Sequence, residues 1–311
     1  MDVLIAADME GIAGIEDYRD CLPSHPRAYA RGRRLMTDEV LAVIEALQAG
    51  GVERISVGDW HMVGTNVERD RMPEGVEVRP IADLALAEAE PSMAKAHGSS
   101  LDAVVMIGHH ARTPSPKGFC SHTFIWEMEV LLDGESLSEM QVYAQALAAE
   151  GIPLLVAAGD RWLLEETDEG ELGDAQLVAT KEGDGRARAR SKGPTAVQAE
   201  LATAVAAALA GPRHPPPARS YPAELVVKAE GEEIARTMVD KPGDLLTAIA
   251  TVFRGSVVSR EYRQLAKLLP ADHASRLRSL QRQAGSLLAT PVMRAKERRW
   301  LASAAPLRPT A

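Results

Sequence analysis

The chain has 311 residues, of which 46% are apolar and 25% charged, a composition typical of an ordinary globular protein of about two domains. The net charge of −9 argues against a nucleic-acid partner, which would require a basic patch. Only two cysteines are present, and neither a leader nor an apolar run of membrane-spanning length is visible. We therefore expect a cytoplasmic protein with no membrane partner and no disulfide framework.

The first part of the chain predicts a strand, a helix and a second strand. The apolar run 3–7 predicts a buried strand, and the loop 16–30 contains Pro23 and Pro26 and is expected to be irregular. A helix is predicted over 38–49, with Thr37 as its N-cap and the glycines at 50–51 as its end. A strand over 54–58 follows. This order predicts a right-handed parallel crossover.

The pattern of strands and helices continues to residue 210. The segment 102–108 is uniformly apolar, as is typical of a strand buried on both faces. Further strands are predicted at 76–81, 127–133, 153–157 and 177–180, and helices at 83–96, 136–149 and 195–210. The sequence therefore predicts an α/β fold with a mostly parallel sheet flanked by helices.

A proline-rich segment divides the chain. Three consecutive prolines at 215–217 exclude a helix or a central strand, so residues 212–219 are predicted to be a linker after a domain of residues 1–211. Residues 220–301 are predicted to form a smaller α+β domain that packs on the first or makes oligomer contacts. It would contain a strand at 224–230 and helices at 244–252 and 272–288. The tail 302–311 is predicted to be disordered.

Two carboxylates follow the first strand. Asp8 and Glu10 are two residues apart, so in an extended segment both side chains point the same way, and Gly11 then lets the backbone turn. Two like charges at a strand end repel unless a cation or a proton lies between them, which suggests a divalent metal. The alternative is a helix N-cap beside a solvated loop acid.

Metal-competent side chains also follow two other predicted strands. Asp59 and His61 come after the strand at 54–58, and His109 and His110 come after the strand at 102–108. Ligands of a parallel sheet bind outside the carboxyl ends of its strands, so these side chains are expected to share one edge with the first carboxylate pair. Imidazole and carboxylate donors without a thiolate suit zinc, manganese or a similar divalent ion.

Five short motifs occur together in the order and approximate spacing of one enzyme family. They are Asp8-Met-Glu-Gly-Ile, Asp59-Trp-His61, Gly108-His-His110-Ala, Ser121-His122 and Ser138-Glu139. The segment from Tyr29 to Thr37 has a similar likeness. With these motifs in register, the chain resembles the zinc D-aminopeptidase family across about residues 1–210, and more weakly beyond the prolines.

The resemblance implies a dinuclear site with two divalent ions per subunit. Zinc is the expected ion, with Mn²⁺ or Co²⁺ as alternatives. It assigns Asp8 as the bridging carboxylate, Glu10 and His61 to one ion, His110 and Glu139 to the other, and a catalytic role to His122. We interpret His122 as a proton-transfer or oxyanion-polarising group rather than a nucleophile. Its alternative is a loop histidine bonded to the backbone.

Other roles at these positions stay open at this stage. Glu139 fits a helix capping box with Ser136, and His109 is an alternative ligand to its neighbour His110. Asp59 is expected to orient His61 or its loop rather than bind metal. Cys120 is interpreted as a small buried hydrophobe.

Two further residues are candidates for the substrate pocket. Asp160 follows a predicted strand and is expected to line the pocket. Lys181 would neutralise a substrate carboxylate or an oxyanion, with a solvated charge as the alternative. The arginine-rich stretch over 185–192 receives no role from the sequence.

Together these features predict a metallo-aminopeptidase that removes the N-terminal residue of short peptides, D-amino-acid-containing peptides included, with a metal-bridged hydroxide as the attacking group. The family resemblance implies a ring-shaped homo-oligomer, a decamer. A metal-dependent amidase or phosphoesterase is an alternative, although no glycine-rich phosphate cradle follows the first strand. A non-catalytic metal-binding or peptide-binding protein is the other alternative, and His122 argues against it.

Overall fold

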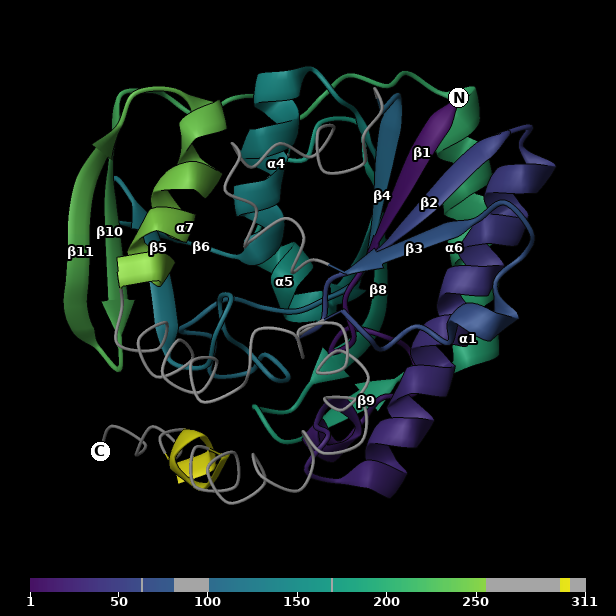
Figure 1. The fold of residues 1–311 in the computed structure, drawn as a ribbon, viewed down its shortest axis with the longest axis horizontal. Coiled ribbons are helices and arrows are strands. Elements are labelled where there is room, and N and C mark those ends of the chain that lie inside the picture. The colour runs from purple at the N-terminus through teal and green to yellow at the C-terminus, as the bar shows by residue number, and fades with distance from the viewer. Residues whose placement is uncertain (63, 81–100, 169, 256–296, 303–311) are drawn as a thin grey trace, which may run out of the picture.

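The main sheet has seven strands in the order β3-β2-β1-β4-β7-β8-β9 (Figure 1). The computed structural model describes all residues except 63, 81–100, 169, 256–296 and 303–311. All neighbouring strands of this sheet are parallel except β8 and β9. The strands are β1 (Asp2–Ala7), β2 (Arg54–Asp59), β3 (Glu77–Pro80), β4 (Ala103–His109), β7 (Leu154–Asp160), β8 (Gln176–Gly183) and β9 (Ala189–Ser191).

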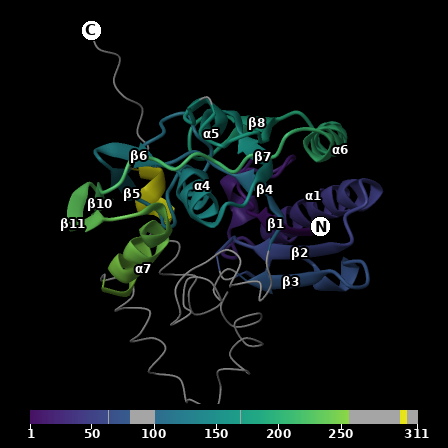
Figure 2. The same cartoon turned by 90° about the horizontal axis from the view of Figure 1, so that it is seen from above.

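Helices cover both faces of this sheet (Figure 2). On one face, α1 (Pro26–Ala49) and α6 (Pro194–Ala210) pack on each other and on alternate residues of β1, such as Val3 and Ile5. On the other face, α4 (Glu139–Glu150) packs on Leu4 and Ala6. The short helix α5 (Arg161–Glu165) follows β7. Strand residues therefore alternate between two apolar cores, which fixes their register.

A second, antiparallel sheet lies beyond α4 in the order β11-β10-β5-β6. Its strands are β5 (Met128–Leu132), β6 (Glu135–Leu137), β10 (Ala223–Ala229) and β11 (Glu232–Val239), and α7 (Leu245–Gly255) packs on it. Strands before and after the prolines thus share one sheet. The division of the chain into domains at 212–219 stays a prediction.

The helix α4 lies between the two sheets and is buried on both sides. Met140 and Ala144 belong to the core cluster on the main sheet, and Val142 belongs to the cluster on the antiparallel sheet. Its N-cap is Ser138, which forms a capping box with Gln141. Packing on both sheets and the capping box therefore fix the position of Glu139, the first residue of α4.

The predicted α/β fold is confirmed, and two helix starts differ from the prediction. The helix predicted from residue 38 begins at Pro26, because proline is tolerated in the first helical turn; the Thr37 hydroxyl bonds to the carbonyl of Arg33 inside the helix. The capping box predicted for Ser136 and Glu139 is formed by Ser138 and Gln141 instead.

Some elements of the structure were not predicted, and some predicted elements lie outside the described residues. The strands β6, β9 and β11 are additions to those predicted, and the described part also contains the 3₁₀ helices η1 (Tyr18–Cys21), η2 (Arg69–Arg71) and η3 (Pro242–Asp244). The helices predicted at 83–96 and 272–288, and almost all of the tail at 302–311, lie outside the described residues. Among the helices that are described, none is long and apolar enough to cross a membrane.

Candidate metal centre

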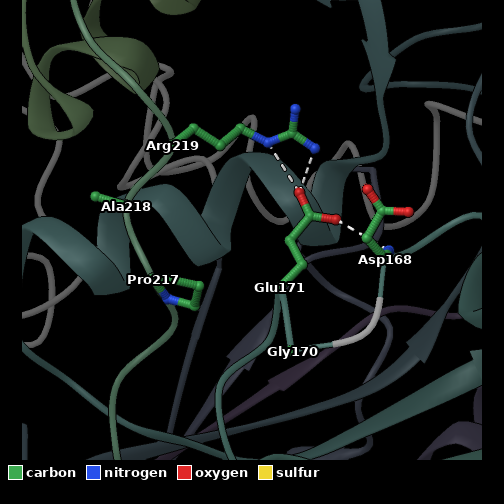
Figure 3. Close-up of a pocket in the computed structure, with 6 residues that line it drawn as sticks. All are labelled: Asp168, Gly170, Glu171, Pro217, Ala218 and Arg219. Atoms are coloured by element: carbon green, nitrogen blue, oxygen red, sulfur yellow. Dashed lines mark hydrogen bonds and ion pairs between the residues drawn. The ribbon is translucent and has the colours of Figure 1, made fainter.

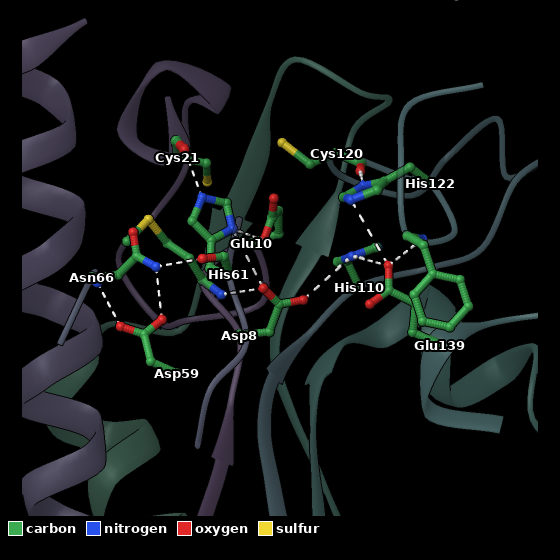
Figure 4. A network of polar contacts seen from close by, with 12 residues as sticks. Asp8, Glu10, Cys21, Asp59, His61, Asn66, His110, Cys120, His122 and Glu139 are labelled. Carbon is green, nitrogen blue, oxygen red and sulfur yellow. Dashed lines mark hydrogen bonds and ion pairs between the residues drawn. The ribbon is translucent and has the colours of Figure 1, made fainter. Parts of the chain in front are cut away.

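Five acidic and imidazole side chains meet at the carboxyl edge of the main sheet (Figure 4). Asp8 and Glu10 follow β1, His61 follows β2, His110 follows β4, and Glu139 opens α4. Because β1 lies between β2 and β4 in a parallel sheet, the loops after these three strands leave at the same edge. The arrangement predicted from the sequence, with these five residues close together, is thus present.

The loop after β1 lies directly across the end of β4. The Asp8 amide donates to the Ile107 carbonyl at 2.9 Å, and the Gly11 amide donates to the Gly108 carbonyl at 2.6 Å. Gly108 has a φ of +74°, and a Cβ there would lie 2.0 Å from the Asp8 carbonyl oxygen. Only glycine fits this crossing, which brings Asp8 and His110 together.

Asp8 lies at the centre of the cluster, with one carboxylate oxygen toward each of two histidines. Its Oδ1 is 3.5 Å from Nδ1 of His61, and its Oδ2 is 3.4 Å from Nε2 of His110. Glu10 Oε2 is 3.0 Å from Nδ1 of His61, and Glu139 Oε1 is 3.5 Å from Nε2 of His110. All five residues are buried. Asp8 therefore lies between a pair formed by Glu10 and His61 and a pair formed by His110 and Glu139.

Backbone carbonyls orient the three imidazoles of the site. His61 Nε2 is 2.8 Å from the carbonyl oxygen of Cys21, and His110 Nδ1 is 3.1 Å from that of Ala111. His122 Nδ1 is 2.7 Å from that of Cys120. Because a carbonyl only accepts, each of these nitrogens carries a proton, and the other ring nitrogen faces the cluster, where it can donate to a carboxylate when protonated and bind a metal ion when deprotonated. This arrangement is typical of metal-binding histidines.

The ring of His122 lies on the ring of His110. The two centroids are 4.0 Å apart with an interplanar angle of 14°. His122 Nε2 is 3.9 Å from Oε1 of Glu139, which also accepts a hydrogen bond from the Phe124 amide at 2.6 Å. His122 thus lies at one side of the cluster, next to Glu139.

The cluster binds positive charge strongly. Burial alone would raise the pKa of Asp8, but the hydrogen bond from His61 and the charge of His110 hold it well below its usual range. The carboxylates reverse the effect of burial on the histidines: Glu10 and Asp8 raise the pKa of His61 far above its ordinary value, and Glu139 raises that of His110 to about 10. Burial and the charge of His110 lower the pKa of His122.

The donors fit a divalent metal. Two donors that each lie about 2.1 Å from one tetrahedral ion are separated by roughly 3.4 Å, close to the separations of Asp8 from its two histidines. Two sets of three donors in the described residues lie close enough together to hold an ion: Asp8 with Glu10 and His110, and His110 with His122 and Glu139. Both sets include His110, His122 belongs to the second, and His61 belongs to neither. Carboxylate and imidazole donors suit zinc and similar ions.

A sequence model of the peptidase family described as D-aminopeptidase (Peptidase M55) matches residues 1–263. The chain belongs to this family. The resemblance inferred from the five motifs is thereby confirmed. The matched region includes all the residues of the metal cluster.

A comparison of sequences and a comparison of structures agree with this assignment. Over 172 residues, the chain is 29% identical to a D-aminopeptidase of Bacillus subtilis (strain 168), a match that spans 54% of this chain and 60% of that protein. The structure of the Zn-dependent D-aminopeptidase DppA from Bacillus subtilis, described as a self-compartmentalizing protease, superposes with a TM-score of 0.69. That match covers 82% of this chain and 97% of the other, at 21% identity, and shows a shared fold.

Asp59 and His109 lie beside the metal cluster of this family member and make other contacts. The Asp59 carboxylate accepts hydrogen bonds from the amides of Asn66 and Val67, and the Asn66 side chain bonds to the carbonyl of His61. Asp59 therefore shapes the loop of His61. The ring of His109 lies edge-on to Trp60, with centroids 6.0 Å apart, away from the two donor groups that include His110.

Lys181 and Asp160 are buried and bind backbone groups. Lys181 Nζ donates to the carbonyls of Glu10 at 2.5 Å and Ile15 at 2.6 Å, so the alternative of a solvated charge is wrong. Asp160 accepts from the amides of Phe119 at 2.7 Å and Gly183 at 3.1 Å. Both residues hold loops near the cluster in place.

Sequence analysis missed the carbonyls of Cys21 and Cys120, since a backbone acceptor leaves no signal in residue type. It also missed the capping role of Gln141, for which the spacing of Ser138 and Gln141 is a readable signal. Gln141 Nε2 donates to Glu171 at 2.9 Å, and Glu171 accepts from Arg219 Nε at 2.8 Å. The end of the proline segment is thus linked to the start of α4.

A surface pocket adjoins this link (Figure 3). It has a volume of about 380 Å³ and contains none of the candidate ligands. It is lined by Asp168, Gly170, Glu171, Pro217, Ala218 and Arg219. Because Arg219 and Glu171 bind each other here, the pocket offers no free charge pair to a ligand.

Proposed function

We propose that this chain is a zinc-dependent aminopeptidase that removes the N-terminal residue of short peptides, peptides with a D-residue included. The observation that carries the proposal is the orientation of the imidazoles. His61, His110 and His122 each donate one ring N–H to a backbone carbonyl and present the other nitrogen to the carboxylate cluster. Membership of the D-aminopeptidase family supports the choice of reaction.

The residues divide into two ligand groups around a shared carboxylate. Glu10 and His61 would hold one ion, His110 and Glu139 would hold the other, and Asp8 would bridge them. When bound, the zinc ions supply a Lewis acid for the scissile carbonyl and lower the pKa of a water molecule. Burial of the ligands excludes bulk water, which strengthens each electrostatic interaction in the site.

His122 is the proposed proton carrier. Its Nδ1–H is bound to the Cys120 carbonyl, so Nε2 is the atom that accepts a proton and later donates it to the leaving amine. The parallel stack on His110 keeps the ring beside the ligands. The His122 side chain is 11% exposed, as is that of Glu139, so it lies at the more open side of the cluster.

We further propose that the protein works as a homo-oligomer. The Bacillus subtilis structure is described as a self-compartmentalizing protease. The strand β11 is an edge of the antiparallel sheet and exposes Ile234 and Met238, which is a surface suited to subunit contact. Light scattering coupled to size-exclusion chromatography tests this proposal, and a monomer at micromolar concentration contradicts it.

Hydrolysis of matched D- and L-aminoacyl p-nitroanilides, with metal analysis of the same protein, tests the proposed reaction. We expect bound zinc, release of p-nitroaniline and loss of activity with a chelator. Substrates with a blocked α-amine should resist hydrolysis. Hydrolysis of p-nitrophenyl phosphate in place of the amides would indicate a phosphoesterase. Bound zinc without any hydrolysis would indicate a binding protein.

A further inference from the structure

The chain continues beyond the family match, and its described residues 297–302 form a helix that packs on the catalytic domain. The match ends at residue 263, and this helix is the yellow segment in Figure 1. Glu297 and Trp300 are buried, whereas Arg298 and Arg299 between them are exposed. The two buried side chains contact two different loops of the domain.

Glu297 binds the segment that starts with η1. Its Oε1 accepts a hydrogen bond from the Tyr18 hydroxyl at 2.7 Å and lies 2.9 Å from Nε2 of His25. Tyr18 also packs edge-on to Trp300, with ring centroids 6.0 Å apart. Burial and the bond to Glu297 raise the pKa of Tyr18 to about 12, so the hydroxyl stays a donor. Both ends of the segment 18–25 are thus attached to the helix.

Trp300 binds a second loop through Arg186. The ring of Trp300 stacks on Trp126, with centroids 5.1 Å apart and an interplanar angle of 13°. Arg186 donates to the Trp300 carbonyl at 3.1 Å and forms an ion pair with Glu127 at 2.5 Å. The arginine-rich stretch that the sequence left without a role therefore anchors the C-terminal helix.

Each of these two loops is connected to a carbonyl that orients a histidine of the candidate metal cluster. On one side, Cys21 closes η1, and its carbonyl accepts from His61 Nε2. On the other side, the Arg186 carbonyl accepts the Cys120 amide at 3.1 Å, and the Cys120 carbonyl accepts from His122 Nδ1. Cys120 has a φ of +49°, a conformation that a non-glycine residue holds only when its surroundings impose it.

We propose that residues 297–302 form a clasp that positions His61 and His122 from outside the site. The clasp touches neither imidazole, so its residues are positioning residues and act through the Cys21 and Cys120 carbonyls. Its effect on catalysis rests on the proposed function, whereas its effect on the two loops does not. The clasp lies outside residues 1–263, the region that the family model matches.

The two cysteines provide a direct probe of the two loops. They are the only cysteines in the sequence: Cys21 ends η1, Cys120 is bound by the Arg186 carbonyl, and both thiols are free and buried. The rate at which Ellman's reagent modifies them in the native protein therefore measures opening of these loops. We expect Glu297→Ala and Trp300→Ala in the full chain to increase that rate by about tenfold or more.

Two control variants separate the clasp from general stability. Arg298→Ala alters an exposed residue of the same helix and should react as slowly as the wild type. Leu225→Ala leaves a cavity in a different core cluster, that of the antiparallel sheet, and lowers overall stability. If Leu225→Ala accelerates modification as much as Glu297→Ala at an equal loss of melting temperature, or if the clasp variants react at the wild-type rate, the clasp is refuted.

Zinc affinity and steady-state kinetics test whether the clasp affects the candidate metal site. We expect Glu297→Ala to weaken zinc binding about tenfold in a chelator competition, and to lower kcat with KM within about twofold, since no clasp residue meets substrate. Glu297→Gln, which keeps the shape and loses the charge, should give a smaller change in the same direction. A wild-type protein without zinc or hydrolysis refutes the proposed function, while thiol modification still decides the clasp.

Discussion

Lys181 donates a hydrogen bond from its buried ammonium group to the backbone carbonyl of Glu10, at 2.5 Å. The same group donates to the carbonyl of Ile15 at 2.6 Å, so one side chain holds the loop after β1 at two points. That loop carries two candidate metal ligands. Lys181 therefore positions the candidate ligands by holding the backbone of their loop.

Lys181→Met should destabilise the protein by about 2–4 kcal/mol, because two buried carbonyls lose their donor. It should also weaken zinc binding, since the loop of Glu10 is freed. Urea unfolding and metal analysis check both effects. The matched control is Lys192→Met, which removes an exposed lysine paired with Glu200 and should change stability by no more than about 0.5 kcal/mol. Equal stability of the two variants contradicts this role.

Glu39→Gln should change the pH dependence of stability. Burial raises the pKa of Glu39 to about 7 from an ordinary value of 4.5, although the Ala13 amide and the charge of Lys181 oppose that rise. The folded state therefore keeps a proton that the unfolded chain releases, so this group's contribution to stability falls as the pH rises from about 4.5 to about 7 and is constant above.

Glutamine cannot ionise, so the variant should gain stability relative to the wild type across that pH interval, by up to about 3 kcal/mol. Chemical unfolding of both metal-free proteins at a series of pH values gives this difference directly. If the stability difference between the two proteins does not vary with pH between 4.5 and 7, the pKa of Glu39 is not raised in the folded state.

Gly108→Ala should be far more harmful than Gly51→Ala. Both glycines have positive φ, +74° and +82°, so both substitutions carry a backbone penalty of about 1 kcal/mol. Only at Gly108 would the new Cβ also strike a backbone atom, the Asp8 carbonyl oxygen, because Gly51 has open space. We expect Gly108→Ala to cost at least about 3 kcal/mol and to displace Asp8. Similar melting temperatures for the two variants would refute the close contact between Gly108 and the Asp8 carbonyl.

His122→Ala should keep its zinc and lose about 10²–10⁴-fold in kcat, the usual contribution of a proton-transfer group. The control is His214→Ala, an exposed histidine paired with Asp174, which should retain full activity. Zinc content by elemental analysis and kcat on an aminoacyl p-nitroanilide are the measurements. Loss of zinc together with activity would make His122 a ligand instead of the proton carrier.

The sequence was sufficient to predict the cluster because parallel strands deliver their following residues to one edge. Asp8, His61 and His110 each follow such a strand, so topology alone brings them together. The start of α1 at Pro26 was not predictable from the loop's prolines, because tertiary packing decides whether a proline opens a helix or breaks it. Contacts such as that of Glu297 with Tyr18 join residues 279 positions apart, and no local pattern encodes them.

The family resemblance favoured His110 over His109, and the structure supplies a physical reason. Both histidines follow the same strand, and residue type does not distinguish them. The positive φ of Gly108 and the close approach of the β1 loop turn His110 toward Asp8, while His109 packs on Trp60. Backbone geometry at one glycine therefore decides which imidazole joins the cluster.

Zinc stoichiometry in the wild type and in Asp8→Ala tests the central claim most directly, namely that one carboxylate joins two metal sites. We expect two zinc ions per subunit in the wild type, and neither held at wild-type affinity in Asp8→Ala, which should also lose hydrolysis. Asp174→Ala, which alters an aspartate outside the cluster, should keep both ions. Two zinc ions and full activity in Asp8→Ala would contradict the account.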